Sequence, residues 1–192
     1  MRSLSPRSAI VIFVFFTWFF LLCILCSAAD DSFVKATSFI SRDKIRPGDS
    51  FKVAIRVSIA PGYHINGNKI ADPYLIPTEL LLENQPSLRI EEYLYPAPRS
   101  ARFSYSESEL VVYEGTVIIG VLVQARKELP LGSQKLKGKL TYQACNSVTC
   151  FPPREVQIEI PLDIVPSSQE TKDINQDIFC NLEFKKDKKQ GK

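Results

Sequence analysis

The chain has 192 residues and a formal net charge of +3 at pH 7, and its last eight residues include five lysines. Residues 30–184 carry 17 basic and 20 acidic side chains, so their net charge is −3 and a basic nucleic-acid-binding face is not indicated. Only three cysteines lie beyond residue 29, too few for a scaffold held by disulfides, so a hydrophobic core must hold the fold together.

The first 29 residues are predicted to be a signal peptide. Arg2 and Arg7 give it a positive start, residues 9–26 contain no charge, and Ser27-Ala-Ala29 offers small residues for a signal peptidase. The uncharged run is about long enough to span a bilayer, so an uncleaved anchor in the inner membrane is the alternative to cleavage. In both cases we expect the rest of the chain to be exported, to the periplasm or out of the cell.

Residues 30–166 are predicted to form one all-β domain, because apolar and polar residues alternate with a period of two and Pro and Gly turns separate the segments. Some eight or nine short strands of this kind indicate an antiparallel sandwich of two sheets. Residues 167–192 are expected to be a polar, lysine-rich tail. The clearest predicted strands span 51–59, 78–83, 87–91, 117–123, 136–144 and 156–164, of which 117–123 is apolar throughout and is expected to be covered on both faces.

Residues 142–153, with the sequence YQACNSVTCFPP, place two cysteines in the loop between consecutive predicted strands. Thiol–disulfide exchange needs one sulfur that can be attacked and a second that can resolve the mixed disulfide, and Cys145 and Cys150 can supply both. The alternative is a structural disulfide that only closes the hairpin, which for so small a ring contributes about 2 kcal/mol. On spacing alone both interpretations stay open.

The same segment resembles the active-site motif of the N-terminal domain of the thiol:disulfide interchange protein DsbD, in which YQ-x-C and C-x-PP frame the redox pair. This resemblance implies an immunoglobulin-like antiparallel β-sandwich that passes electrons from a thioredoxin-like or membrane-embedded donor to periplasmic disulfide proteins, without a cofactor or metal. Three further blocks resemble the family in the same order, Pro61-Gly-Tyr-His-Ile-Asn66, Asp72-Pro-Tyr-Leu-Ile-Pro-Thr78 and Tyr95-Pro-Ala-Pro98, so the resemblance covers about residues 32–165.

The resemblance implies that Cys145 and Cys150 are the catalytic pair, with Cys150 as the sulfur that reacts first and Cys145 as the resolving sulfur. It also implies a cap loop whose aromatic side chain covers the disulfide until a partner docks, and by position the candidates are Phe103 and Tyr105. The other residues expected around the site are Tyr63, His64, Asn66, Tyr142, Gln143, Phe151 and Pro152.

The sequence departs from the DsbD pattern in the cysteine spacing, with four intervening residues instead of five, and in carrying His64 and Asn66 at aromatic positions. A histidine beside the pair could lower a thiol pKa or carry the proton released in exchange, and an ordinary partly buried loop histidine is the alternative. The chain also lacks the multispanning segment and the thioredoxin-like domain of DsbD, so we expect it to exchange electrons with a separate protein.

Two other functions remain as alternatives. The first is a non-catalytic β-sandwich binding module with a structural hairpin disulfide. The second is a copper site made by His64, Cys145 and Cys150, since soft thiolates suit Cu(I), although an oxidising compartment favours the disulfide. Cys180, in the predicted tail, is expected to be a free thiol.

Overall fold

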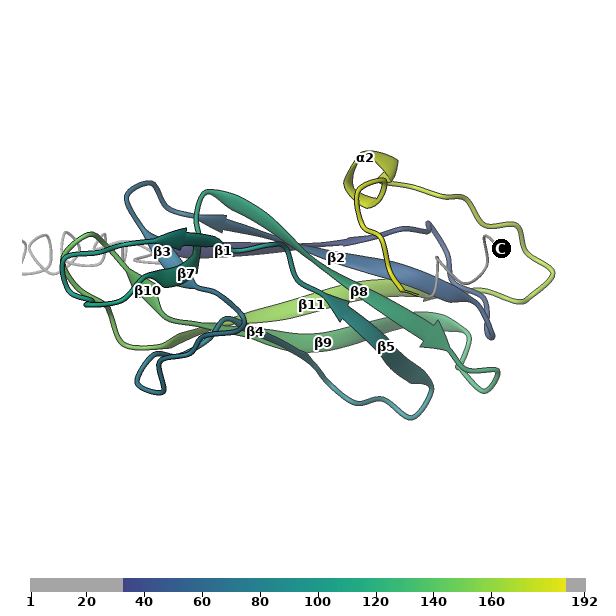
Figure 1. The fold of residues 1–192 in the computed structure, drawn as a ribbon. Coiled ribbons are helices and arrows are strands. Elements are labelled where there is room, and N and C mark those ends of the chain that lie inside the picture. Colours follow the sequence, from purple (N-terminus) through teal and green to yellow (C-terminus); the bar gives the residue numbers. More distant parts are fainter. Residues whose placement is uncertain (1–32, 186–192) are drawn as a thin grey trace, which may run out of the picture. The chain divides into compact units, whose positions relative to one another are not determined.

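Strands make up about half of the part of the chain that the computed structural model describes, residues 33–185 (Figure 1). The predicted signal peptide and the last lysines lie outside the described residues. No helix within residues 33–185 is long and apolar enough to cross a membrane. The elements are β1 (Val34–Ile40), β2 (Ser50–Ile59), β3 (His64–Asn66), β4 (Glu79–Leu82), β5 (Leu88–Leu94), β6 (Arg99–Ala101), β7 (Leu110–Tyr113), β8 (Thr116–Ala125), β9 (Gly132–Tyr142), β10 (Ala144–Cys145), β11 (Arg154–Ile164) and α2 (Gln176–Phe179).

Two antiparallel sheets face each other across one hydrophobic core. The first has the strand order β1-β2-β8-β5 and the second the order β11-β9-β4, and Figure 1 shows them as two layers. The alternating apolar residues of both sheets meet between the layers, where Ile55, Val121 and Leu136 are fully buried. The predicted all-β, immunoglobulin-like antiparallel β-sandwich is therefore confirmed.

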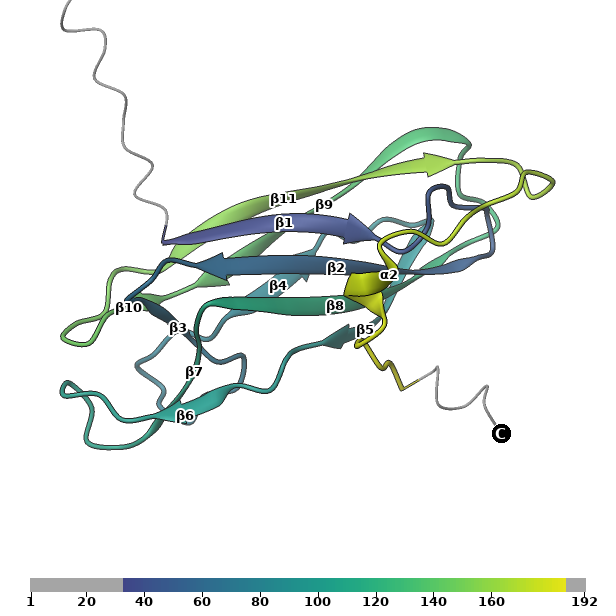
Figure 2. The same ribbon diagram turned by 90° about the horizontal axis from the view of Figure 1, so that it is seen from above.

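A third, smaller sheet at one end of the sandwich positions the cysteines. Its strand order is β10-β3-β7-β6, and it lies among the loops at that end (Figure 2). β9 and β11 form the predicted hairpin, with Tyr142 opposite Arg154. Between these two strands the chain leaves the hairpin, and the two residues of β10 pair with β3 instead, which places Cys145 opposite His64.

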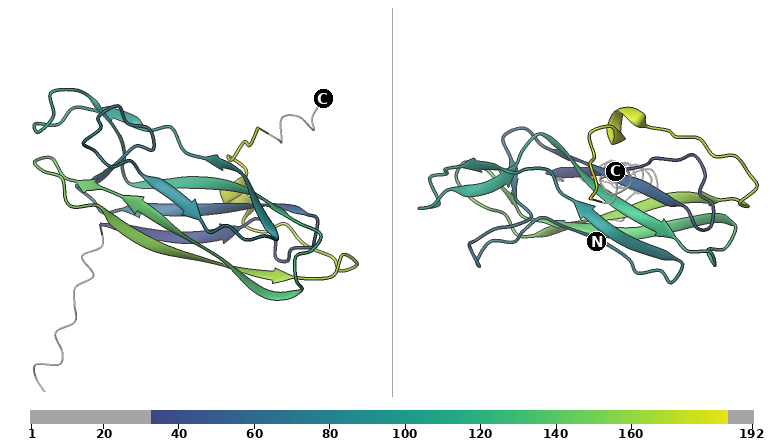
Figure 3. Two further views of the ribbon diagram at one scale, coloured as in Figure 1. Left: turned by 90° about the horizontal axis from the view of Figure 1, so that it is seen from below. Right: turned by 45° about the vertical axis from the view of Figure 1, so that its right-hand side comes forward.

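Residues 171–185 return to the outer face of the first sheet, where α2 lies over β2 and β8 (Figures 2 and 3). The side chains of Ile178, Phe179 and Phe184 are buried there. Part of the stretch predicted as a polar tail is thus packed, because β8 presents apolar residues on its outer face as well as its inner face. This contact explains why β8 has no polar alternation, as expected for a strand covered on both faces.

Candidate active site at the Cys145–Cys150 loop

Cys145 and Cys150 form a disulfide that closes a tight loop at the end of the sandwich. Their sulfurs are bonded at 2.01 Å and their Cα atoms are 4.0 Å apart. The loop between them is held by Asn146, whose side-chain Oδ1 accepts hydrogen bonds from the backbone N–H groups of Val148 and Thr149, both at 2.9 Å. An asparagine that caps its own turn in this way stabilises a compact loop without help from regular secondary structure.

The two sulfurs differ in accessibility. Cys145 is fully buried, whereas Cys150 is half-buried, and Val148 at the loop tip is 71% exposed. Cys145 is buried because β10 leaves the sheet of β9 and β11 and pairs with β3.

Gln143 and Asn66 connect the cysteine loop to the rest of the end sheet. Gln143 Oε1 accepts hydrogen bonds from Asn66 Nδ2 at 3.2 Å and from the backbone N–H of Ile76 at 3.1 Å. Gln143 Nε2 donates to the backbone carbonyl of Phe151 at 3.2 Å. An amide side chain accepts through its oxygen and donates through its nitrogen at the same time, which gives the glutamine of the YQ-x-C motif a physical role.

One aromatic cluster packs beside the cysteine loop. Phe33, Tyr63 and Phe151 contact one another with ring centroids 4.5, 4.7 and 5.9 Å apart, and the guanidinium of Arg154 lies 4.9 Å from the centre of the Phe33 ring. The structure thus brings the expected Tyr63 and Phe151 together. Phe33 was missed, because a single phenylalanine before the first strand carries no pattern that distinguishes it from a core residue.

A second aromatic cluster joins the predicted cap residues to His64. The Phe103 ring stacks on the imidazole with centroids 4.0 Å apart, and the Tyr105 hydroxyl is hydrogen-bonded to His64 Nε2 at 2.8 Å. Phe103 and Tyr105 belong to the loop of residues 102–109 between β6 and β7, which we call the cap loop. This loop also reaches the cysteine loop directly, because Ser104 Oγ donates to the backbone carbonyl of Ser147 at 3.0 Å.

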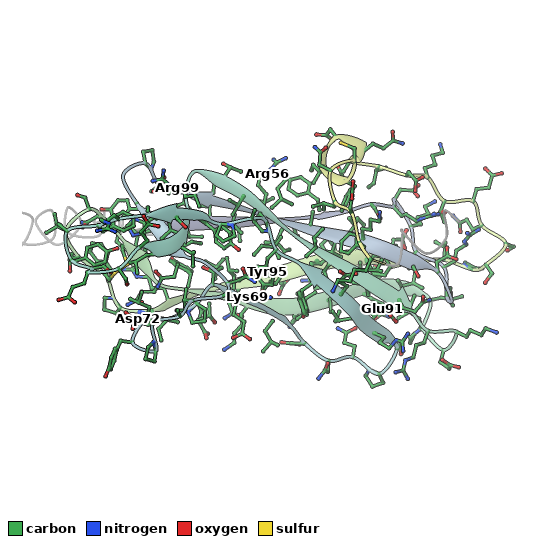
Figure 4. All side chains as sticks on the ribbon, viewed as in Figure 1. Arg56, Lys69, Asp72, Glu91, Tyr95 and Arg99 are labelled. Carbon is green, nitrogen blue, oxygen red and sulfur yellow. A yellow bond between two sulfur atoms is a disulfide. The ribbon has the colours of Figure 1, made fainter. Side chains whose placement is uncertain are left out.

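Burial governs the electrostatics of this second cluster. Loss of hydration lowers the pKa of His64, the negative charge of Glu114 opposes that shift, and the positive charge of Arg99 adds to it. Arg99 lies at the same end of the molecule as β10 (Figure 4). Burial also raises the pKa of Tyr105, so both members of the hydrogen bond are favoured in their neutral forms.

The remaining predicted residues lie at the edges of the site or away from it. Tyr142 is buried in the core of the sandwich, and Pro152 is exposed after the cysteine loop. Cys180 is an exposed free thiol whose Sγ donates to the Asp177 carbonyl, and it follows α2, at the other end of the domain from β10 (Figure 1). Across residues 33–185, no group of three or more His, Cys, Asp or Glu side chains is arranged to hold a metal ion.

The chain thus combines an immunoglobulin-like sandwich with a disulfide in a short loop at one end, in which Cys150 is half-buried. Residues 31–162 match the family described as the N-terminal domain of the thiol:disulfide interchange protein DsbD. The chain therefore belongs to this family.

Two solved structures are similar to this chain. The N-terminal periplasmic domain of ScsB from Proteus mirabilis shares 14% sequence identity at a TM-score of 0.47, over 71% of this chain and 49% of that one. The N-terminal domain of DsbD from Neisseria meningitidis, in the reduced form, shares 18% identity at a TM-score of 0.39, over 70% of this chain and 89% of that one. This chain thus spans about half of the ScsB chain. No curated protein matches it in sequence.

Proposed function

We propose that this protein is an envelope thiol–disulfide exchange protein that passes electrons from a redox partner to client proteins through Cys145 and Cys150. The observation that carries the proposal is the asymmetric burial of the disulfide in a domain of this family, with Cys145 covered and Cys150 partly accessible. Exchange requires one sulfur within reach of an external thiolate and one sulfur kept beside it.

Burial of Cys145 supports an order of steps. A thiolate of the reduced partner attacks Cys150 Sγ, the bond between the two cysteines breaks, and its electron pair passes to Cys145 Sγ, which takes up a proton. The second thiolate of the partner then attacks the partner's own sulfur in the mixed disulfide and releases Cys150 as a thiolate. The partner leaves oxidised, and this domain has gained two electrons and, once Cys150 is protonated, two protons.

The same residues serve the delivery of electrons. The Cys150 thiolate attacks a disulfide of the client and forms a mixed disulfide, and the displaced client sulfur leaves as a thiolate. Cys145, held within bonding distance by the Asn146 turn, then attacks Cys150 and releases the second client sulfur. The domain returns to its oxidised form and the client is reduced, so no cofactor is needed to balance the electrons.

We assign the cap to Phe103, with Tyr105 supporting it. Directly opposed residues of an antiparallel pair project to the same side of the sheet with Cβ atoms about 5 Å apart, so the His64 ring lies beside Cys145. Phe103 stacks on that ring, and the neighbouring Ser104 is hydrogen-bonded to the cysteine loop. A loop in this position hinders small thiols and yields to a protein whose surface replaces its contacts.

For partners we propose a thioredoxin-like or membrane-embedded thiol–disulfide oxidoreductase as the donor and exported disulfide proteins as the acceptors. Export through residues 1–29, or anchoring by residues 9–26, would place the domain in the periplasm, where such clients occur. Nucleic acid is not proposed as a partner, because residues 30–184 carry more acidic than basic side chains.

Reduction kinetics test this function. We expect the oxidised protein to be reduced quickly by a reduced thioredoxin-fold protein and slowly by glutathione, because only the protein can displace the cap loop. Stopped-flow measurement of both rates, with Cys180→Ser in all samples so that only the site disulfide reacts, checks this. Equal rates with both reductants would remove the case for a gated redox site.

The alternative, a disulfide that only closes the hairpin, makes a different prediction. In that case the double variant, Cys145→Ser with Cys150→Ser, has a free energy of unfolding about 2 kcal/mol below that of the wild type. Electron transfer is not affected by the double variant. A reduction potential well below about −300 mV would also favour an inert bond. Both outcomes separate the staple from the carrier.

A further inference from the structure

His64 lies between the disulfide and the cap loop. Its backbone pairs with Cys145 across β3 and β10, and its side chain is 2% exposed. The imidazole makes two contacts with the cap loop. The Tyr105 hydroxyl is hydrogen-bonded to one edge of the ring, and the Phe103 ring stacks on one face. The His64 side chain on β3 therefore contacts both aromatic residues of the cap loop.

The geometry of the three rings separates two kinds of contact. The His64 and Tyr105 rings are nearly parallel, with an interplanar angle of 5° and their centroids 6.4 Å apart, and the hydrogen bond between Nε2 and the hydroxyl joins them. Phe103 stacks on both, at 16° to His64 and at 12° to Tyr105. Phe103 contributes apolar contact, whereas the hydrogen bond fixes the direction of the Tyr105 ring.

Hydrogen bonding explains why a polar residue is tolerated at this buried position. A buried imidazole or hydroxyl without a partner costs free energy, and here each is the partner of the other. When the cap loop opens, both groups regain water, so the net effect of the bond on closure is modest. A bond of this strength can keep the loop closed most of the time and still break when a partner docks.

Space next to Tyr105 allows the loop to open. A cavity of about 310 Å³ borders the Tyr105 ring between the cap loop and the loop that follows β3. This space beside Tyr105 is where its side chain would have room to move once its hydrogen bond is broken. The other residues that line the cavity are Asp72, Leu75, Ser106, Glu107, Ser108 and Leu110.

We propose that His64 is a positioning residue that latches the cap loop over the Cys145–Cys150 disulfide through its hydrogen bond to Tyr105, and that breaking this bond admits a partner thiolate to Cys150. The proposal rests on the exchange function proposed above. It assigns His64 a role in gating rather than in proton transfer. The sulfur chemistry is unchanged, and the latch controls only how often the cap loop is open and the disulfide accessible.

Variants that remove the hydrogen bond from either side test the latch. Tyr105→Phe keeps the ring and removes only the hydroxyl, and His64→Phe keeps an aromatic stacking surface, slightly larger than the imidazole, and removes both ring nitrogens. We expect each variant to increase the rate of reduction by glutathione about fivefold, the effect of losing one ordinary hydrogen bond. Because both variants remove the same bond, the double variant should also show about a fivefold increase, not the product of two increases.

A conservative variant and a matched control complete the experiment. His64→Gln offers Tyr105 a new hydrogen-bonding amide, so its glutathione rate should fall back toward that of the wild type. Tyr74→Phe removes the hydroxyl of a tyrosine that is 91% exposed, and its rate should not change. Thermal unfolding of each variant verifies that it is folded, and Tyr105→Phe, at a half-buried site, is the least disruptive of them.

The outcomes separate the latch from the exchange function. An unchanged glutathione rate in Tyr105→Phe, or a double variant with the product of the two single effects, overturns the latch while wild-type exchange with a thioredoxin-fold protein continues. Failure of the wild type to exchange with any thioredoxin-fold protein overturns the exchange function instead. A shared increase that His64→Gln reverses supports the latch.

Discussion

His64 is the single histidine of the chain, so its titration is separable from that of every other group near neutral pH. The charged and titratable groups around it are few. Tyr105 is hydrogen-bonded to its ring, Arg99 on β6 disfavours a second positive charge, and Glu114 after β7 favours one. Burial is the largest influence, and it lowers the pKa of His64 below its usual value.

A lowered histidine pKa predicts a specific pH dependence of stability. Above the unfolded-state pKa, near 6.5, the neutral ring contributes fully, and this contribution is lost as the pH falls through the lowered folded-state value. Urea unfolding at about pH 7.5 and 5.5 should show that the wild type loses more stability than His64→Gln. The lowered pKa values of Asp43 and Glu155 act at lower pH and are common to both proteins. The same pH dependence in both would contradict the burial argument.

At the scale of single residues, the sequence predicted which side chains carry the chemistry better than it predicted which of them are buried. The cysteine pair and Gln143 lie in one short segment, so a local motif was enough to predict them. The burial of Cys145 depends on pairing with His64, which is 81 residues earlier in the chain, and no local pattern reports such a contact. The stacking of Phe103 on His64 is hidden from the sequence for the same reason.

Among the elements, β4 shows how this fold protects an open edge. The strand lies at the edge of the second sheet, where the backbone N–H groups on its outer side have no neighbouring strand. The hydroxyl of Tyr95 accepts the N–H of Leu80 at 2.8 Å, and the hydroxyl of Tyr93 accepts the N–H of Leu82 at 3.1 Å. Tyr95 thereby bridges the two layers (Figure 4). Paired edges of this kind resist association with other chains.

Removal of the Tyr95 hydroxyl should weaken this bridge. In Tyr95→Phe the ring still packs against the core, but the Leu80 N–H loses its acceptor at a partly buried position. We expect the free energy of unfolding to fall by about 1 kcal/mol, as for the loss of one net hydrogen bond. Urea unfolding measures this change, with the exposed Tyr74→Phe as the control that should show none. Equal stability of the two variants would show that water replaces the hydroxyl without cost.

The long strands could be predicted from the sequence, and the short ones could not. β2, β9 and β11 have ten or eleven residues each, enough for the alternation of apolar and polar side chains to be unmistakable. β3, β6 and β10 have three, three and two residues, too few to show any period. Together with the four residues of β7, these three strands form the end sheet, so most of the element that positions the disulfide was hidden from the sequence.

For the whole molecule, the C-terminal segment extends the packed structure beyond the family match, which ends at residue 162. Backbone hydrogen bonds attach it to the end of β1, from Asp43 N to Lys172 O and from Ile174 N to Ser41 O, both at 3.0 Å. Its few apolar residues show no period and stand among charged ones, so the sequence predicted a solvated tail. Their packing is explained only by the apolar outer face of β8, which they cover.

Gly120 of β8 and Phe184 of the C-terminal segment fit together closely. Phe184 is fully buried, and a Cβ added at Gly120 would lie 2.9 Å from Phe184 Cζ, closer than two carbon atoms can approach. The next neighbours of that Cβ are Leu182 Cδ1 at 3.3 Å, a tight contact that a small shift of the leucine side chain relieves, and Leu94 Cβ at 3.5 Å, an ordinary contact. The glycine is therefore required by its partner rather than by the strand.

A double-mutant cycle tests this dependence. Phe184→Ala should lower the free energy of unfolding by about 3 kcal/mol, the low end for a buried phenylalanine. Gly120→Ala should destabilise the wild type by displacing the ring. In the Phe184→Ala background the same change should be neutral or stabilising, since alanine is better than glycine in a strand. Urea unfolding of the four proteins measures the coupling. Additive effects would mean that Phe184 does not contact Gly120 in solution. The C-terminal segment would then cover the apolar outer face of β8 only loosely.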